Sequence, residues 1–334
     1  MRAMLWDALP GGEAQCHVCS HGCRIPAGGN GRCGVRVNHK GQLLSLVGNV
    51  STSLQMDPVE KKPLYHFLPG TRTFSVGSAG CNFGCRFCQN HHISQINPKS
   101  RIAGRRVQPE ELVRLAARNR APSISFTYNE PTVFFEQAYE AAGMAKARNI
   151  RVILVSNGFM SRDFLLAMRQ RVDAINVDLK SFSDSFYRKL CGGRLQPVLD
   201  NLRTIRELGW WLEVTTLLIP GINDSPAELR EIAGFIRDEL GPETPWHISG
   251  FHGAHLMADH PATPPFQLEE SWKSAREEGL AHVYVGNTPS PLGGNTYCPS
   301  CGELLVERHG YRSRSRIRDG KCRSCQAPVA GVWK

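Results

Sequence analysis

Three cysteines lie close together in a glycine-rich segment, SAGCNFGCRFCQN, which follows an apolar stretch predicted to form a strand. They are Cys81, Cys85 and Cys88, in the spacing CxxxCxxC. A structural zinc site requires a fourth ligand, for which His91 and His92 are the nearest candidates. Three thiolates suit a four-iron, four-sulfur cluster better, because three irons are then held by the protein and the fourth keeps an open coordination position. An open iron indicates a reactive site.

A second group of cysteines lies near the N-terminus, at Cys16, Cys19, Cys23 and Cys33. Four thiolates in a short segment fit a structural zinc ion and an auxiliary iron–sulfur cluster equally well, so both interpretations stay open. Cysteines this close together favour metal binding over a disulfide framework, particularly in a chain of 334 residues that has room for a large core. The isolated Cys191 is interpreted as a small buried apolar side chain.

Two Cys-x-x-Cys pairs lie near the end of the sequence, at Cys298, Cys301, Cys322 and Cys325. Their separation is typical of a zinc ribbon, in which four thiolates form a tetrahedral site and stabilise a segment too short to build a core. Between the pairs, arginines alternate at the period of a strand, which predicts four guanidinium groups on one face. These are Arg312, Arg314, Arg316 and Arg318. Such a face could bind nucleic-acid phosphates, although a solvated ribbon surface is the simpler interpretation.

The elements that must position these groups are short β-branched segments alternating with helical patterns, which predict βα units and a parallel sheet. The predicted strands are 73–77, 123–128, 152–156, 174–179, 212–219, 246–250 and 282–286. The predicted helices are 110–118, 134–148, 162–171, 198–208, 226–240 and 268–278. We therefore expect an α/β fold with a full or partial TIM-type (β/α) barrel over residues 73–287. Residues 1–72 would form a four-cysteine metal-binding lobe, and residues 288–334, which begin with a linker of turn formers, the zinc ribbon.

The formal charge of +10 counts every thiol as neutral. Two four-thiolate metal sites and one three-thiolate cluster would reduce it to about +5, which is only modestly basic. The N-terminus lacks an apolar segment behind a basic start, and no stretch approaches the roughly 18 apolar residues of a membrane span. We therefore expect a cytoplasmic protein that does not enter a membrane.

Polar residues follow or end three of the predicted strands, where the active sites of such barrels are built. They are Asn129, Glu130, Ser156, Asn157, Asp178 and Lys180. Simple structural roles are also open, namely a helix cap at Asn129 and a salt bridge between Asp178 and Lys180.

With the aromatic Phe87 before its last cysteine, the three-cysteine segment resembles the CxxxCxφC signature of the radical SAM superfamily. The resemblance implies that Cys81, Cys85 and Cys88 hold a 4Fe-4S cluster whose open iron binds S-adenosylmethionine (SAM). In that family an electron from the cluster cleaves SAM to methionine and a 5'-deoxyadenosyl radical, which removes a hydrogen atom from the substrate. The protein positions the cofactor and excludes competing reactions.

The resemblance also implies cofactor contacts at the strand ends. The segment TYNEP is similar to the family's GGEP segment, with Tyr128 and Asn129 in place of the glycines, and implies that Glu130 meets the amino group of SAM. Asp178 and Lys180 resemble a pair that contacts the ribose and carboxylate of SAM in glycyl-radical activating enzymes. His252, in the segment WHISGFH, resembles a residue near the adenine, whereas His247 at the start of that strand is interpreted as a core histidine. The expected cofactor-binding residues are therefore Phe87, Asn129, Glu130, Ser156, Asn157, Asp178, Lys180 and His252.

Further segments, among them CHVCSHGC, LLIPGIND, YVGNTP and NTYCPSCG, make nearly the whole chain similar to the AmmeMemoRadiSam-system radical SAM enzymes, relatives of the pyruvate formate-lyase activating enzymes. This implies an electron donor such as flavodoxin or ferredoxin and an unidentified small-molecule or protein substrate. Three hypotheses follow. The chain is a radical SAM enzyme with an unknown substrate, an activase that abstracts hydrogen from a glycine of a partner enzyme, or a non-enzymatic nucleic-acid-binding protein whose cysteines are all structural.

Overall fold

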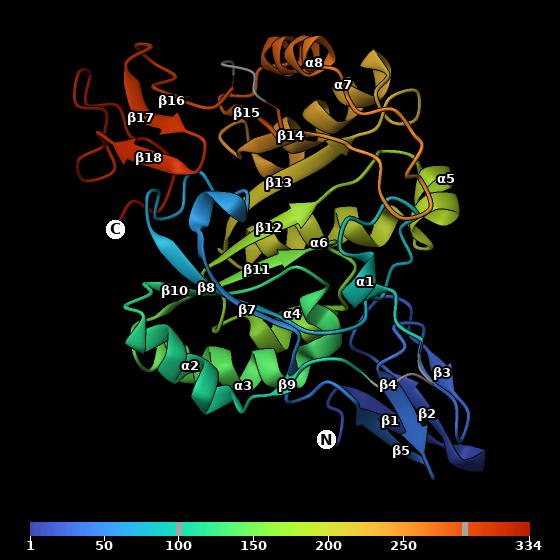
Figure 1. Cartoon of the computed structure of the whole chain (residues 1–334). Helices are drawn as coiled ribbons and strands as arrows, with labels where there is room; N and C mark the ends of the chain where they lie inside the picture. Colours follow the sequence, from blue (N-terminus) through green and yellow to red (C-terminus); the bar gives the residue numbers. More distant parts are fainter. Residues whose placement is uncertain (98–101, 289–292) are drawn as a thin grey trace.

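A curved sheet of eight strands forms the centre of the molecule (Figure 1). The computed structural model describes residues 1–97, 102–288 and 293–334. The strands are β7 (Ser53–Pro58), β8 (Arg72–Gly77), β10 (Ser123–Phe126), β11 (Arg151–Ser156), β12 (Ala174–Asp178), β13 (Trp211–Leu218), β14 (Trp246–Gly250) and β15 (Val283–Gly286). They lie in the order β15-β14-β13-β12-β11-β10-β8-β7, in which β8 and β10 to β15 pair in parallel and β7 pairs antiparallel with β8. Because β15 and β7 stand at the two ends of this order, the barrel is partial.

All seven predicted parallel strands are confirmed, and the differences lie at their ends. β10 ends at Phe126, two residues before the predicted end, because Tyr128 has a φ of 72° that no strand accommodates. The eighth strand, β7, comes from the 1–72 segment that we expected to be separate from the barrel. The main sheet therefore begins before the predicted domain boundary.

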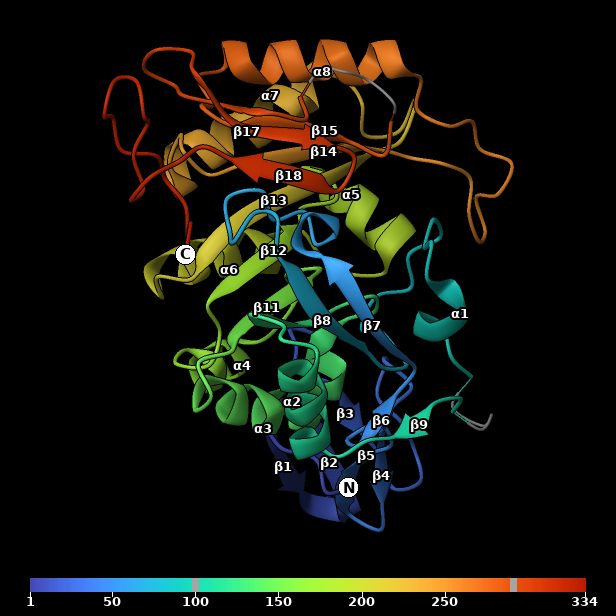
Figure 2. The same ribbon diagram turned by 60° about the vertical axis from the view of Figure 1, so that its left-hand side comes forward.

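Helices cover the outer side of the sheet (Figures 1 and 2). They are α2 (Pro109–Arg118), α3 (Phe135–Lys146), α4 (Arg162–Met168), α6 (Gln196–Glu207), α7 (Pro226–Phe235) and α8 (Pro265–Glu277), with the short α1 (His91–Ser94) and α5 (Asp184–Phe186) in loops. A 3-10 turn (Pro131–Phe134) leads into α3, and π-helical turns follow α5 (Tyr187–Cys191) and α7 (Ile236–Leu240). Serine N-caps fix two starts: the hydroxyl of Ser161 accepts a hydrogen bond from the Phe164 amide, and Ser225 caps α7 in the same way. None of the helices in the described ranges is long and apolar enough to span a membrane.

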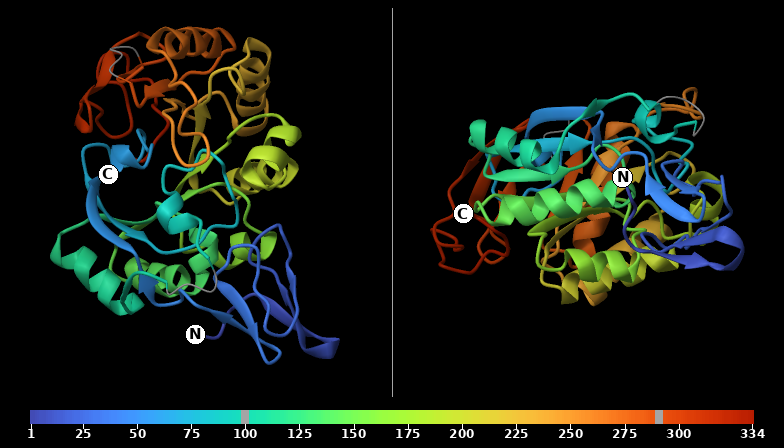
Figure 3. Two further views of the ribbon diagram at one scale, coloured as in Figure 1. Left: turned by 45° about the vertical axis from the view of Figure 1, so that its right-hand side comes forward. Right: turned by 90° about the horizontal axis from the view of Figure 1, so that it is seen from below.

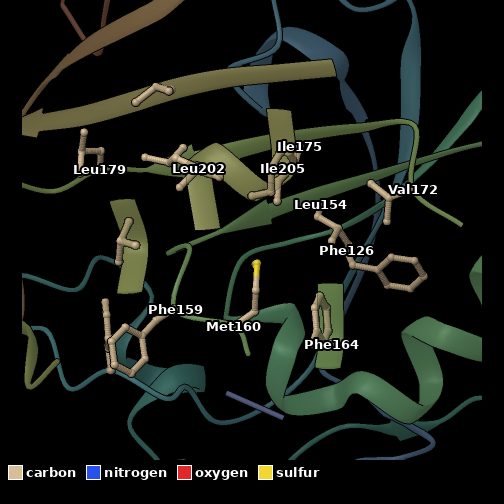
Figure 4. Close-up of a cluster of buried hydrophobic side chains, with 14 of the residues drawn as sticks. Phe126, Leu154, Phe159, Met160, Phe164, Val172, Ile175, Leu179, Leu202 and Ile205 are labelled. Carbon is tan, nitrogen blue, oxygen red and sulfur yellow. The ribbon is translucent and has the colours of Figure 1, made fainter. Parts of the chain in front are cut away.

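The main hydrophobic core lies between the sheet and these helices (Figure 4). Phe126 and Leu154 from the sheet pack in one cluster with Phe164 of α4 and Leu202 of α6, all fully buried. Each such side chain contributes about 1.5–3 kcal/mol by leaving water. This packing fixes the position of the strands, and therefore of the polar loops that follow their carboxyl ends.

The N-terminal lobe and the C-terminal ribbon lie at opposite ends of the molecule (Figures 1 and 3). The lobe contains β1 (Trp6–Leu9), β2 (Glu13–Cys16), β3 (Arg24–Ile25), β4 (Arg36–His39) and β5 (Gln42–Ser45). The small pair of β6 (Val50–Ser51) and β9 (Arg105–Arg106) connects it to the barrel. Buried lobe side chains, including Val18, Val35 and Leu43, belong to the same hydrophobic cluster as the barrel core. The lobe is thus packed onto the barrel as one body.

A buried ion pair joins the lobe to the barrel. The guanidinium of Arg36 contacts the carboxylate of Glu136 on α3, and both side chains are only 1% exposed. Arg36 also donates a 2.8 Å hydrogen bond to the carbonyl of Met4. Removing one partner of such a pair leaves the other charge buried without compensation.

We expect Glu136→Ala to lower the free energy of unfolding by about 3–5 kcal/mol, because Arg36 then stays buried without its carboxylate. Urea denaturation followed by circular dichroism measures this change. Glu140→Ala, on the exposed side of the same helix, is the control and should change stability by less than about 0.5 kcal/mol. Equal effects of the two substitutions would show that the buried pair contributes nothing specific.

The ribbon consists of β16 (Thr296–Tyr297), β17 (Leu304–His309) and β18 (Arg312–Ser315). The predicted row of four arginines on one face is wrong, because β18 ends at Ser315 and Arg316 turns towards Glu307. Only Arg312 and Arg314 share a strand face. Part of the predicted linker, residues 289–292, lies outside the described residues.

Candidate active site

A cavity of about 540 Å³ opens at the strand ends that the sequence singles out. The three thiols of Cys81, Cys85 and Cys88 line it. Seven of the eight expected cofactor-binding residues line it as well: Phe87, Asn129, Glu130, Ser156, Asn157, Asp178 and Lys180. The loops after β8, β10, β11 and β12 therefore bring together residues that are up to about a hundred positions apart in the chain.

The three-cysteine loop is fixed by its backbone. The amides of Gly84 and Arg86 donate hydrogen bonds of 2.8 and 2.9 Å to the carbonyls of Cys191 and Leu190 in the π-helical turn after α5. The thiol of Cys88 lies 3.2 Å from the hydroxyl of Ser94. Among the described residues of this loop, no three of the Cys81, Cys85 and Cys88 thiols and the His91 and His92 ring nitrogens lie within 4.8 Å of one another. The loop therefore contains no preformed set of ligands at the size of one zinc ion.

Cys191, which we interpreted only as a buried apolar residue, contacts the site directly. It is fully buried, and a hydrogen bond from its thiol lowers the pKa of Cys85. The nearby ammonium of Lys180 lowers the pKa of Cys85 further. The spacing of Cys191 in the sequence gives no sign of this role, because the contact depends on how the turn after α5 folds back against the loop.

The turn after β10 is tight although it lacks glycine. Tyr128 and Asn129 stand at the positions of the two glycines of the related GGEP segment. Tyr128 takes a left-handed backbone conformation (φ 72°), which costs a non-glycine residue about 1–3 kcal/mol. The side chain of Asn129 accepts a 2.9 Å hydrogen bond from the Ser78 amide and donates a 2.7 Å bond to the Gly80 carbonyl. These bonds tie the second strand end to the start of the cysteine loop.

The carboxylate of Glu130 holds two loops together in the cavity wall. It accepts hydrogen bonds from the amides of Thr132 (3.1 Å) and Asn157 (2.9 Å) and from the hydroxyl of Ser156 (2.9 Å). Burial raises its pKa, while these donors oppose the rise. Asn157 in turn donates to Asn82, next to Cys81, at 2.7 Å. Glu130, Ser156 and Asn157 thus form one network, in which much of the acceptor capacity of Glu130 is already used.

Asp178 and Lys180 form the salt bridge that was one of the two predicted alternatives, with Nζ 2.9 Å from the carboxylate. Both side chains also line the cavity, where Lys180 is 13% and Asp178 39% exposed. Burial disfavours the charged ammonium, but Asp178 and the neighbouring thiols raise the pKa of Lys180 well above its usual range. Lys180 is therefore a fixed positive charge beside the three cysteines, 5.9 Å from the ring of Phe87.

His252 is the one of the eight expected cofactor-binding residues that does not line the cavity. It is exposed, and its Nδ1 lies 3.2 Å from the side-chain nitrogen of Gln89, the residue after Cys88. His247 is buried and bonded to Glu213 at 2.6 Å, as expected of a core histidine, yet it also lines the cavity.

The far wall of the cavity was not predicted, because it comes from the segment after β7 and from the ribbon. Lys62 is buried, pairs with Asp57 at 2.7 Å and lies 4.5 Å from the ring of Tyr128. Hydrogen bonds from Lys62 and Tyr128 hold the pKa of Asp57 well below its usual range despite its burial. Tyr65 and Tyr311 complete this wall with aromatic surface.

The ribbon supports this wall and brings together four thiols that could hold a metal ion. The guanidinium of Arg308 donates a 2.7 Å hydrogen bond to the Tyr65 carbonyl. The thiols of Cys298, Cys301, Cys322 and Cys325 all lie within 4.8 Å of one another, with separations of 3.6 and 3.7 Å for two pairs. Four thiolates around one zinc ion at about 2.3 Å are about 3.8 Å apart, so the set fits a tetrahedral ion.

We expect Cys301→Ser to remove about one zinc ion per chain, because a structural zinc site needs all four of its ligands. Mass-spectrometric metal analysis and limited proteolysis of residues 298–325 measure the loss of metal and of order. Ser300→Ala, at the exposed neighbouring position, is the control and should retain both. Full zinc content in the Cys301 variant would contradict the assignment.

Around the three-cysteine loop, the cavity combines three thiols with the ammonium of Lys180, the carboxylates of Glu130 and Asp178 and several amides. This set fits a cluster with three protein ligands beside a zwitterionic cofactor. The three-cysteine loop follows β8, the first parallel strand of a partial barrel. This arrangement is typical of α/β enzymes in which a cofactor reacts at the carboxyl ends of the strands.

Comparisons with known proteins agree with this class. The model of the family described as "Radical SAM superfamily" matches residues 75–235. Protein MJ0808 of Methanocaldococcus jannaschii is 42% identical over 324 residues, which are 97% of this chain and 96% of that protein. Benzylsuccinate synthase activating enzyme of Thauera aromatica is 23% identical over 228 residues, 62% of this chain and 68% of that protein. A radical SAM methyltransferase from Sphaerobacter thermophilus shares the fold, with a TM-score of 0.52, 19% identity and coverage of 71% of each chain.

The chain belongs to the radical SAM superfamily and is an enzyme. The family implies a 4Fe-4S cluster and SAM as cofactors. Membership therefore contradicts the hypothesis of a non-enzymatic nucleic-acid-binding protein. Placement among the AmmeMemoRadiSam-system enzymes stays a prediction.

Proposed function

We propose that Cys81, Cys85 and Cys88 hold the 4Fe-4S cluster and that the enzyme cleaves SAM reductively to a 5'-deoxyadenosyl radical, which abstracts hydrogen from a substrate in the same cavity. The observation that carries the proposal is the convergence of the three thiols with Asp178, Lys180 and the amides of the next strand ends on one cavity. When bound, the cluster supplies the single electron that breaks the carbon–sulfur bond of SAM.

The side chains of the protein would bind and orient the cofactor. Lys180, which Asp178 keeps charged, would attract the carboxylate of SAM. The carboxylate oxygen of Asp178 that does not bind Lys180 would accept a hydrogen bond from a ribose hydroxyl. Glu130 would meet the ammonium of SAM only through acceptor positions that Thr132, Ser156 and Asn157 leave open.

The far wall defines the kind of substrate that we expect. Tyr65, Tyr128 and Tyr311 offer aromatic surface, and Lys62 and His247 add polar groups. A cavity of about 540 Å³ that also holds SAM leaves space for a small polar molecule or a single side chain. We expect a flavodoxin or ferredoxin to supply the electron.

Transfer of a deuterium label tests this proposal. The reconstituted, reduced enzyme is incubated without oxygen with SAM and pools of deuterated candidate metabolites, and the 5'-deoxyadenosine formed is analysed by mass spectrometry. Label in the nucleoside identifies the substrate. Absence of 5'-deoxyadenosine from protein that holds its full iron content would overturn the proposal.

A second candidate function is activation of a partner enzyme, which the similarity to benzylsuccinate synthase activating enzyme favours. In this case the radical would abstract hydrogen from a backbone glycine of the partner. Electron paramagnetic resonance of mixtures with candidate lyases distinguishes the two, because a glycyl radical gives a signal that a small-molecule substrate does not.

A further inference from the structure

The lobe thiols are arranged differently from the ribbon thiols. The distances between the four ribbon thiols already match those around one zinc ion. Among the residues that the structure describes, no three of the lobe thiols lie within 4.8 Å of one another. They nevertheless belong to one packed region: the Cys16 amide donates a 2.9 Å hydrogen bond to the Cys23 carbonyl, and Cys23 and Cys33 pack against the hydrophobic cluster that contains Cys16 and Cys19. This wider spacing suits an occupant larger than a single ion.

The lobe group touches the three-cysteine loop directly. His21, between Cys19 and Cys23, bonds through Nε2 to the carbonyl of Asn82 at 2.8 Å, and its ring packs against Phe159 with centroids 4.8 Å apart. On the other side, a side chain at Gly80 would come within 2.7 Å of the Cys33 carbonyl. The residues on both sides of Cys81 thus contact residues within or between the lobe cysteines.

The lobe also has less need of a structural ion than the ribbon. The small core of the ribbon has five buried members, of which two are cysteines. Buried lobe residues instead belong to the large barrel core, and the Arg36–Glu136 pair anchors them to α3. The guanidinium of Arg36 additionally lies 3.7 Å from the thiol of Cys16. A buried cation that donates to a ligand sulfur is one of the protein's means of adjusting the reduction potential of an iron–sulfur cluster.

We propose that Cys16, Cys19, Cys23 and Cys33 hold a second iron–sulfur cluster, which passes electrons to the three-cysteine site. The relay role rests on the proposed function of that site. One electron enters the lobe cluster from a reduced flavodoxin or ferredoxin, which is oxidised by one electron. The same electron leaves for the three-cysteine site and is consumed when SAM is cleaved to methionine and the radical, so that the lobe cluster returns to its oxidised form.

Metal content tests the site without reference to activity. The full-length triple variant Cys81→Ala/Cys85→Ala/Cys88→Ala, reconstituted without oxygen, should keep iron, sulfide and a Mössbauer spectrum of an iron–sulfur cluster, with about one zinc ion in the ribbon. A triple variant that holds no iron and about two zinc ions would overturn the proposal. Because this variant leaves the lobe untouched, its result does not depend on whether lobe substitutions fold.

The double variant Cys19→Ala/Cys23→Ala makes the two proposals separable. If it retains iron while the triple variant has none, the three-cysteine site stands and the lobe cluster is wrong. If it has no iron while the triple variant keeps its iron, the lobe cluster stands and the proposed function fails.

The relay is tested by comparing two reductants. The double variant should still form 5'-deoxyadenosine when a small chemical reductant reaches the three-cysteine site, and should lose the reaction driven by reduced flavodoxin. An equal rate with reduced flavodoxin in the variant and the unaltered enzyme would overturn the relay. Loss with both reductants, together with full iron in the three-cysteine site, would also contradict it.

Discussion

Cys85→Ala is expected to abolish SAM cleavage, with no 5'-deoxyadenosine above that of protein lacking iron. Cys85 is the central thiol of the loop, is buried and lines the cavity, so its loss leaves the cluster with two protein ligands. Chromatography of the products formed by the reduced variant measures the nucleoside.

Cys191→Ser is the matched control for Cys85→Ala. It changes the fully buried thiol that bonds to Cys85 but keeps a hydrogen-bond donor there. The iron content of the three-cysteine site should therefore be retained. Loss of that iron in the Cys191 variant, with retention in the Cys85 variant, would reverse the assignment of ligand and neighbour.

Lys180→Ala is expected to weaken SAM binding by roughly 1.5–3 kcal/mol, the usual value of a lost charge-assisted hydrogen bond. That is about 10- to 150-fold in the dissociation constant. The effect should be large because Lys180 is almost buried beside Asp178, which keeps it charged within the cavity. Equilibrium binding of SAM to the unreduced enzyme measures the change apart from catalysis.

Lys189→Ala removes the same charge from an exposed position outside the cavity lining and serves as the control. It should leave the dissociation constant of SAM unchanged. Equal effects at both positions would indicate a long-range charge effect, and unchanged binding in the Lys180 variant would make its salt bridge with Asp178 purely structural.

Much of the barrel could be predicted because its signals are local. Most of the parallel strands are short segments rich in β-branched residues, and β11 contains the continuous apolar run VILV because both of its faces are buried. Strand ends were less certain where a single residue departs from extended geometry, as Tyr128 does with its positive φ. The convergence of Asp178 and Lys180 with the cysteines follows from parallel pairing, which places all the carboxyl ends of the strands at one edge.

What could not be predicted depends on contacts between distant parts of the chain. The segment after β7 forms the far wall of the cavity because β7 pairs with β8, and nothing in its composition marks Lys62 or Tyr65 as site residues. Cys191 is held beside Cys85 by hydrogen bonds from the Gly84 and Arg86 amides to the Cys191 and Leu190 carbonyls, more than a hundred residues further along the chain. His252, at a motif position that resembles an adenine contact, is exposed and lies beside Gln89 rather than in the cavity wall, so its role stays a prediction.

The most direct test of the central claim is electron–nuclear double resonance of the reduced enzyme with SAM that is isotopically labelled at its amino nitrogen and carboxylate. We predict coupling of both labels to the cluster, because three thiolates from the loop leave one iron free to bind them. A cluster that shows no coupling, with its fourth iron bound by a protein side chain, would contradict the proposed function.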